Sequence, residues 1–154
     1  MEIGATKAVQ DRLKTTKIEE SKGASLVFCW DTHLTKIKGR NVLFIVNASN
    51  RYTIAMTDIE PRNWNYYTMY ISRVIHGVMQ EMGYSEDQIG QYFKMSGDTT
   101  VTKTHGRKSV GGINRMVMDA QYFGKKLEKE AKYQWELSEY LNRDICQPEG
   151  FDAY

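Results

Sequence analysis

The chain has 154 residues, of which 41% are hydrophobic, so it is long enough for a single domain that buries its own core. Its formal net charge is only +2, and no apolar run approaches the roughly 20 residues of a membrane-spanning helix, which argues against a membrane protein. Its two cysteines, Cys29 and Cys146, fit neither a disulfide framework nor a zinc-binding pattern, so we expect reduced thiols in a cytoplasmic protein with no metal and no other cofactor.

Charge is unevenly distributed along the chain. Residues 32–57 and residues 99–118 each contain four basic residues and no acidic one, whereas residues 128–154 contain seven acids and three bases. Local potential, rather than net charge, concentrates counter-ions. The two basic stretches therefore favour an anionic ligand or partner, and the alternative is that they are ordinary solvated strand faces.

The first half of the chain predicts a strand, a helix and a sheet. Glu2–Ala5 can form a short strand, and Thr6 can cap a helix over Lys7–Leu13 because its hydroxyl can accept a hydrogen bond from a first-turn amide. A polar loop follows over residues 14–23. Four later segments are rich in β-branched and aromatic residues and predict an antiparallel meander: Leu26–Trp30, His33–Ile37, Val42–Val46 and Arg51–Thr57.

Within this meander, Gly39 supplies the positive φ that a tight turn requires. In the last strand Tyr52, Ile54 and Met56 share one face because side chains alternate along a strand. The sheet is therefore expected to present one apolar face to a helix.

Two helices follow the sheet in the prediction. Asn63 is placed to cap a helix that begins at Trp64, and apolar residues at helical spacing form the stripe that packs on the sheet: Tyr67, Ile71, Val74, Ile75, Val78 and Met82. Ser85 and Gln88 have the spacing of a capping box, which predicts a short helix to about Met95.

The remaining segments predict a strand over Thr99–Thr104 and a long helix over Ser109–Ile145, with Gly124 as the point where it bends or breaks. Together the elements predict an α+β fold: an antiparallel β-meander packed by a central helix, with a long C-terminal helix. Residues 1–118 form the predicted core domain, and residues 119–154 form a helical extension.

Beyond about Gly124 the predicted helix is longer than a small sheet can cover, and it carries Tyr133, Trp135 and Tyr140. Two uses are open. The extension can contact another protein or a second copy in a homodimer or higher oligomer, or it can fold back onto the first helix.

The segment Thr102–Ser109 is the best candidate for a binding site. It leaves a strand, turns at Gly106 and is expected to enter a helix at Ser109, where free amides and the helix dipole favour an anion. Basic side chains within it add positive charge and can donate paired hydrogen bonds, so phosphate or carboxylate is the expected ligand. Its glycine spacing is not that of a nucleotide-binding P-loop. The alternative is a hydrophilic turn in which Ser109 is a plain helix cap.

Two residues outside this segment join the same site if the strand Glu2–Ala5 pairs with Thr99–Thr104. Asn114 lies about one turn into the predicted helix, and Lys7 lies just inside the first helix. The predicted ligand-binding set is Lys7, Lys103, Thr104, Arg107, Lys108, Ser109 and Asn114. On the central helix, Tyr66 and Tyr70 lie beside Arg73 and either stack on a ligand ring or pack at the edge of the core.

Catalysis and nucleic-acid binding have weaker support. Of the three scattered histidines only His105, close to Arg107, is placed to act as an acid or base beside a bound phosphate. The basic strand residues Lys36, Lys38 and Arg40 could contact phosphates. However, the pI of about 8.4 and the lack of a helix-turn-helix or an RNP-like strand argue against nucleic-acid binding.

Several motifs together resemble one family, called DUF6933, over residues 1–118. They are Ala5-Thr-Lys7, Phe28-Cys-Trp30, Val42–Asn47 and the late Thr102-Lys-Thr-His-Gly-Arg107 with Ser109 and Asn114. The resemblance implies the family fold and its characteristic positions: Thr6, Lys7, Trp30, Asn47, Lys103, Thr104, Arg107, Ser109 and Asn114. The sequence departs from the family pattern at two places. The family tends to have arginine directly before the serine, whereas Lys108 stands between Arg107 and Ser109 here. After Trp30 the chain reads Asp31-Thr-His33 where the family usually has a run similar to His-Ala-Asn.

Bacterial members of such families often reside on plasmids and phages, so the resemblance also implies a mobile-element role that includes interference with host defence. The leading hypothesis is a non-enzymatic binding protein for a phosphate-bearing, nucleotide-like small molecule at Lys103, Arg107 and Lys108. Two alternatives are a protein-binding inhibitor or adaptor that uses the C-terminal helix, and a phosphate-ester enzyme that uses His105.

Overall fold

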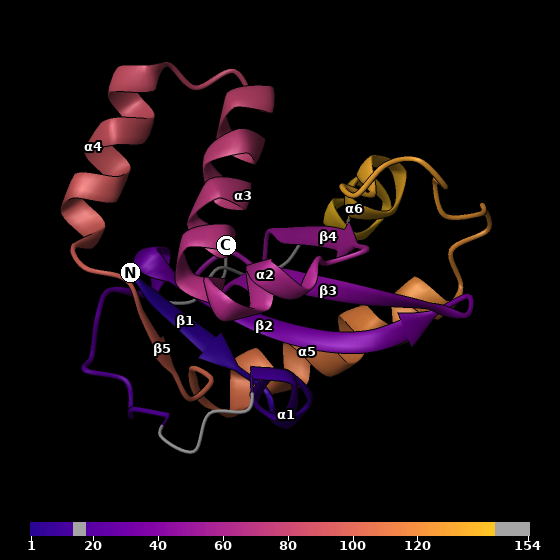
Figure 1. Cartoon of the computed structure of the whole chain (residues 1–154), viewed down its shortest axis with the longest axis horizontal. Coiled ribbons are helices and arrows are strands. Elements are labelled where there is room, and N and C mark those ends of the chain that lie inside the picture. Colours follow the sequence, from indigo (N-terminus) through magenta and orange to yellow (C-terminus); the bar gives the residue numbers. More distant parts are fainter. Residues whose placement is uncertain (14–17, 144–154) are drawn as a thin grey trace, which may run out of the picture.

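The computed structural model describes residues 1–13 and 18–143, and it confirms an α+β fold built on one five-stranded sheet (Figure 1). The strands are β1 (Glu2–Ala5), β2 (Cys29–Ile37), β3 (Arg40–Asn47), β4 (Thr53–Thr57) and β5 (Thr100–Thr102). The helices are α1 (Lys7–Leu13), α2 (Pro61–Asn65), α3 (Tyr67–Glu81), α4 (Glu86–Ser96), α5 (Gly106–Gln121) and α6 (Trp135–Asn142), and a 3₁₀ turn over Leu26–Phe28 precedes β2.

The sheet is mixed, and only part of it is the predicted meander. Its strand order is β4-β3-β2-β1-β5. Strands β2, β3 and β4 are antiparallel neighbours as predicted, whereas β1 is parallel to both β2 and β5. The two segments predicted as Leu26–Trp30 and His33–Ile37 form one strand after the 3₁₀ turn. All four residues of β1 are buried, as expected for a strand with neighbours on both sides.

The predicted turn and side-chain alternation are confirmed. Lys38 and Gly39 have φ values of 49° and 81°, as a two-residue hairpin whose twist matches that of the flanking strands requires. In β4, Ile54 and Met56 enter one hydrophobic cluster and Ala55 enters the other. The sheet therefore has two apolar faces, and helices must pack on both of them to bury these side chains.

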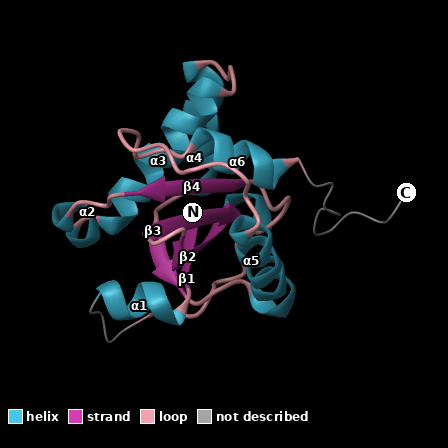
Figure 2. Ribbon diagram, turned by 90° about the vertical axis from the view of Figure 1, so that its right-hand side faces the viewer, coloured by secondary structure: helices cyan, strands magenta, loops and turns pink. Residues whose placement is uncertain are grey.

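A hydrophobic cluster lies on each face, and Figure 2 shows α5 on one side of the sheet and α2 on the other. The first cluster joins the sheet to α2 and α3 and includes Ile3, Trp30, Leu43, Ile45, Ile54, Trp64, Tyr67, Ile71, Ile75 and Val78. The second joins the sheet to α5 and α6 and includes Ile37, Val42, Phe44, Val46, Ala55, Ile113, Met116, Ala120 and Leu137. The predicted apolar stripe of the central helix is thus confirmed for Tyr67, Ile71, Ile75 and Val78, which are buried against the sheet.

The start of the central helix differs from the prediction, whereas the start of α4 agrees with it. The central helix is two helices, and Asn63 is not a cap but lies inside α2, which begins at Pro61. Proline suits a first helical turn because its missing amide has no partner there in any case. The capping box of Ser85 and Gln88 at the start of α4 is confirmed in both directions, at 3.2 and 2.9 Å.

The predicted long C-terminal helix is wrong. Helix α5 begins at Gly106, three residues earlier than expected, and ends at Gln121, and the later helix α6 is short. The break falls close to Gly124, where helix propensity is weakest. The core explains the interruption, because Phe123 and Leu127 in the connecting segment pack into the same cluster as Met116. The predicted end of the helix at Ile145 lies outside the described residues.

The segment around α6 covers the free edge of β4. Ala55 donates its amide to Ser138 Oγ at 3.0 Å, and Thr53 donates its amide to Asn142 Oδ1 at 2.7 Å. Gln134 donates its amide to the Ala55 carbonyl at 2.9 Å. An uncovered strand edge is prone to pair with other chains, so these bonds satisfy an edge that would otherwise be exposed.

Close packing of β1 against β2 requires glycine at position 4. Gly4 is the register partner of Asp31, and a Cβ atom at Gly4 would lie 1.8 Å from Asp31 Oδ1. Gly90, in α4, has open space at the same position. We therefore expect Gly4→Ala to lower the free energy of unfolding by about 1–3 kcal/mol or more through overpacking. Gly90→Ala should instead raise it by about 0.5–1 kcal/mol through helix propensity. Urea unfolding followed by circular dichroism measures both, and equal stability of the two variants would contradict the packing at Gly4.

Candidate functional site

The carboxyl ends of β1 and β5 lie side by side, as the site prediction required. Glu2 pairs with Thr100 and Gly4 with Thr102 in a parallel ladder. Helix α1 follows β1 and helix α5 follows β5, so the chain leaves both strands at the same end of the sheet (Figure 1). Helices α1 and α5 therefore both start at the end of the sheet where the basic segment Thr99–Met118 leaves β5.

Ser109 does not occupy the helix start. It lies in the fourth position of α5, it is buried, and its hydroxyl donates a hydrogen bond to Asp31 Oδ2. The residue at the N-cap position is His105, whose backbone amide donates to the Asp31 carboxylate at 3.2 Å. A carboxylate at a helix N-terminus is a favourable arrangement. The protein's own Asp31 is thus an anion bound at the start of α5.

The other predicted residues lie on the surface around this buried centre. Lys103 forms an ion pair with Glu20 at 2.5 Å, and Lys7 forms one with Asp11 at 2.6 Å. Arg107, Lys108 and Asn114 are exposed and Thr104 is half-buried. The structure brings the strand ends of the predicted set together, but Ser109 faces the interior and two of the lysines contact carboxylates.

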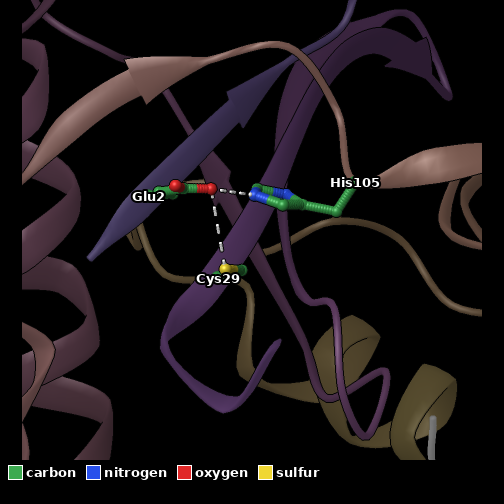
Figure 3. A group of neighbouring side chains, drawn as sticks. All are labelled: Glu2, Cys29 and His105. Atoms are coloured by element: carbon green, nitrogen blue, oxygen red, sulfur yellow. Dashed lines mark hydrogen bonds and ion pairs between the residues drawn. The ribbon is translucent and has the colours of Figure 1, made fainter. Parts of the chain in front are cut away.

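His105 lies between two carboxylates and its side chain is only 3% exposed. Its Nδ1 is 2.6 Å from Asp31 Oδ1, and its Nε2 is 2.8 Å from Glu2 Oε2 (Figure 3). Glu2 also accepts hydrogen bonds from the Ser21 hydroxyl at 2.7 Å and from the Lys22 amide at 2.8 Å. Both ring nitrogens are engaged, so the arrangement favours a structural ion pair over an acid or base that reaches a substrate.

The electrostatics of this network follow from burial and close carboxylates. Burial by itself disfavours the charged imidazolium, but hydrogen bonds and charge from Asp31, with contributions from Cys29 and Glu2, outweigh it and raise the pKa of His105 to about 11. Burial also disfavours the charged form of Glu2, yet its bonds to Ser21, His105 and the Lys22 amide lower the pKa of that carboxyl. The imidazolium and the Glu2 carboxylate therefore stabilise each other.

Sequence reasoning missed two members of this network, Glu2 and Asp31, and it predicted no more for Cys29 than a reduced thiol. These residues are far from His105 in the chain, and only the parallel pairing of β1 with β2 and β5 brings them together. One signal was present: Glu2 lies in a predicted strand, and Asp31 lies between two segments that are each predicted as strands. Glu2, Cys29 and His105 are residue types that can hold a metal ion.

A pocket of about 320 Å³ lies on α2 and α3, away from the predicted site. Its lining residues are Arg62, Asn63, Tyr66, Met69, Tyr70 and Arg73. The sequence predicts Tyr66, Tyr70 and Arg73 side by side on the central helix, where the tyrosines either stack on a ligand ring or pack at the edge of the core. Tyr66 is 66% exposed, and burial raises the pKa of Tyr70. This pocket combines aromatic rings with two guanidinium groups.

A second pocket, of about 330 Å³, lies between the sheet and helices α3 and α4. Its lining is mainly apolar and aromatic and includes Trp30 and Asn47, two of the positions that the family resemblance singled out. Trp30 Nε1 donates to the Tyr92 hydroxyl at 2.9 Å, which in turn donates to the Val27 carbonyl at 2.7 Å. Asn47 also donates to the Val27 carbonyl, at 3.1 Å. These bonds fix the pocket wall.

Removal of His105 should be far more damaging than removal of an exposed histidine. His105→Ala leaves Asp31 and Glu2 buried without their cationic partner, which is expected to cost about 3–5 kcal/mol of stability. His76, whose ion pair with Glu86 is exposed, provides the matched control. Urea unfolding of the two alanine variants measures the difference. Equal midpoints would show that the buried pair contributes no more than the surface pair.

The contribution of His105 should also depend on pH. Its pKa is raised from 6.5 to about 11 in the folded protein, so its stabilising effect is complete below pH 6.5 and is lost as the pH rises toward 11. The gap in unfolding free energy between the wild type and His105→Ala should therefore narrow between neutral pH and about pH 10. Unfolding curves at several pH values test this, and a gap that widens would contradict it.

Comparison with known proteins places the chain in a family. The family model described as "Domain of unknown function (DUF6933)" matches residues 2–154. The match extends beyond residue 118, where the resemblance from individual motifs ended, and so includes the C-terminal segment. Comparisons with curated proteins and with solved structures found no match. The chain therefore belongs to the DUF6933 family.

Proposed function

We propose that this protein binds a phosphate-bearing, ring-containing small molecule without covalent chemistry, in the pocket on α2 and α3. The observation that supports this is the composition of the pocket: two arginines, Arg62 and Arg73, beside two tyrosines, Tyr66 and Tyr70. A guanidinium group can donate two parallel hydrogen bonds to a phosphate. Tyrosine rings can stack on the flat face of a nucleotide base, as they do in proteins that bind single-stranded nucleic acids.

This pocket is a better phosphate site than the start of α5. At α5 the helix terminus already contacts the Asp31 carboxylate, which would repel a second anion. On α3, by contrast, the guanidinium of Arg73 contacts the Met69 sulfur at 3.1 Å and has no carboxylate partner within the described residues. The exposed Arg62 lies 3.3 Å from the half-buried Glu60, and such a pair at the surface is weak enough for a phosphate to replace it.

A second candidate function is binding of a neutral ring-bearing molecule in the apolar pocket next to α3 and α4. This pocket has no charged side chain in its lining, and its volume of about 330 Å³ lies at the small end of the usual range for ligand pockets. Its lining residues include Met82 and Tyr84, which are exposed, and Trp30, which is buried. This candidate predicts a different ligand charge, so one experiment can separate the two.

The test uses saturation-transfer NMR and calorimetric titration with adenosine monophosphate, adenosine and pyrophosphate as probes. We expect the monophosphate to bind more tightly than adenosine. Arg73→Ala should weaken its binding about tenfold or more, because a charge-assisted hydrogen bond contributes about 1.5–3 kcal/mol. Arg107→Ala is the matched control, an exposed arginine at the site first predicted, and it should leave binding unchanged.

Other outcomes would redirect or reject the proposal. Loss of binding in Arg107→Ala but not in Arg73→Ala would return the site to the start of α5. Equal binding of adenosine and its monophosphate, abolished by Met82→Trp but not by Met118→Trp, would favour the apolar pocket; both methionines are exposed, and Met118 lies on α5. Failure of all three probes to bind would reject a nucleotide-like ligand.

Partner binding and interference with host defence stay predictions. The short helix α6 places Leu137 in the core, so part of its apolar surface is already covered. Met118, Tyr122 and Trp135, on and near α5 and α6, are exposed hydrophobic residues that support a contact with a protein partner or a second copy. None of the helices in the described ranges is long and apolar enough to cross a membrane.

A further inference from the structure

Three side chains of metal-ligating types meet on the face of the sheet that α5 covers. Glu2, Cys29 and His105 each offer one ligand atom, and these atoms all lie within 4.8 Å of one another. Glu2 Oε2 is 2.8 Å from His105 Nε2 and 3.9 Å from Cys29 Sγ. Figure 3 shows the three side chains turned toward a common point.

Backbone pairing, not loop flexibility, brings two of these ligands together. Glu2 and Cys29 are direct register partners in the parallel β1–β2 ladder, so their side chains leave the same face of the sheet. His105 follows β5, the other neighbour of β1, and occupies the N-cap position of α5. Ligands that are placed by strands and by a helix start are held more precisely than ligands on a mobile loop.

We infer that the meeting of Glu2, Cys29 and His105 is a divalent-metal site whose natural occupant is zinc. Zinc accepts thiolate, imidazole and carboxylate ligands together, at about 2.3 Å for sulfur and about 2.0–2.2 Å for nitrogen and oxygen. A tetrahedral ion at those bond lengths needs about 3.3 Å between the nitrogen and oxygen and about 3.6 Å between the sulfur and oxygen. The present separations of 2.8 and 3.9 Å differ from these by about half an ångström or less.

The surroundings of His105 are those of a metal-ligating histidine. Its Nδ1 is 2.6 Å from Asp31 Oδ1, which leaves Nε2 to face Glu2 and Cys29. A carboxylate on the far nitrogen of a ligating histidine fixes the ring and increases its basicity. Asp31 is itself held by Ser109, and Gly4 gives it room because any Cβ there would collide with it. The Ser21 hydroxyl donates to Glu2 Oε2 at 2.7 Å, so a further oxygen lies beside the same carboxylate atom.

Exchange of protons for the metal keeps the charge of this buried region constant. When a divalent ion binds, the Cys29 thiol and the His105 imidazolium each release one proton to solvent. Two positive charges leave and two enter, so no net charge is added to the interior, where an added charge would be costly. The bound ion would then join β1, β2 and the start of α5 in place of the hydrogen bond between Glu2 and His105.

The test uses Co²⁺ as a spectroscopic probe in the full chain carrying Cys146→Ser. That substitution leaves Cys29 as the only thiol, because the sequence has two cysteines. We expect one Co²⁺ per chain, with the near-ultraviolet sulfur-to-cobalt charge-transfer band that only thiolate ligation produces, and displacement of the cobalt by one equivalent of Zn²⁺. His76→Ala should retain the band, and Glu2→Gln should weaken Co²⁺ binding at least tenfold.

The inference is overturned if the folded Cys146→Ser protein shows no charge-transfer band at saturating Co²⁺, or if cobalt binds without the band. It is also overturned if Glu2→Gln binds as tightly as its parent. Circular dichroism confirms that Glu2→Gln is folded. If that variant is unfolded, the stoichiometry and the band of the parent protein decide the question by themselves. Nucleotide binding on α2 and α3 does not enter this experiment, so the two proposals fail or succeed separately.

Discussion

The contact between the Asp31 carboxylate and His105 joins residues 74 positions apart in the chain and determines where α5 begins. Asp31 accepts hydrogen bonds from the His105 amide and from the Ser109 hydroxyl, so the first turn of the helix wraps around a buried anion. A partly satisfied network of this kind would destabilise the interior, because each buried charge needs its partner. Gly4 is therefore as much a part of the network as the charged residues, since only glycine leaves space for the carboxylate.

The same sheet face is polar at one end and apolar at the other, and α5 crosses both. Its start lies over Glu2 and Asp31, and its later residues Ile113 and Met116 enter the hydrophobic cluster with Phe44. Hydrophobic packing alone is non-directional and would tolerate a helix shifted along its axis. Hydrogen bonds at the first turn are directional, so they select one position. The polar end thus supplies the specificity of the packing, and the apolar end supplies most of its driving force.

Local patterns predicted the elements that are determined locally. The strand alternation at Ile54 and Met56, the Gly39 turn and the capping box at Ser85 depend on residues a few positions apart, and all three are confirmed. The parallel placement of β1, the break after Gln121 and the inward position of Ser109 depend on contacts across the whole chain. For the site, the predicted pairing of β1 with β5 is confirmed, but Glu2 and Asp31 were missed because the sequence pattern within a few residues does not show which acids on other strands lie nearby.

This also changes what an acid-free segment means. Residues 99–118 contain no acid, yet carboxylates from elsewhere reach into the segment: Asp31 and Glu2 contact His105, and Glu20 contacts Lys103. Charge counted along the chain therefore overstates the positive potential there, since potential depends on the distances between groups in the fold. Cations without a carboxylate partner in the described ranges are the ones that can attract an anion from solution. By that criterion Arg73, in a pocket with two tyrosines, is better placed than any residue whose charge a neighbouring acid already offsets.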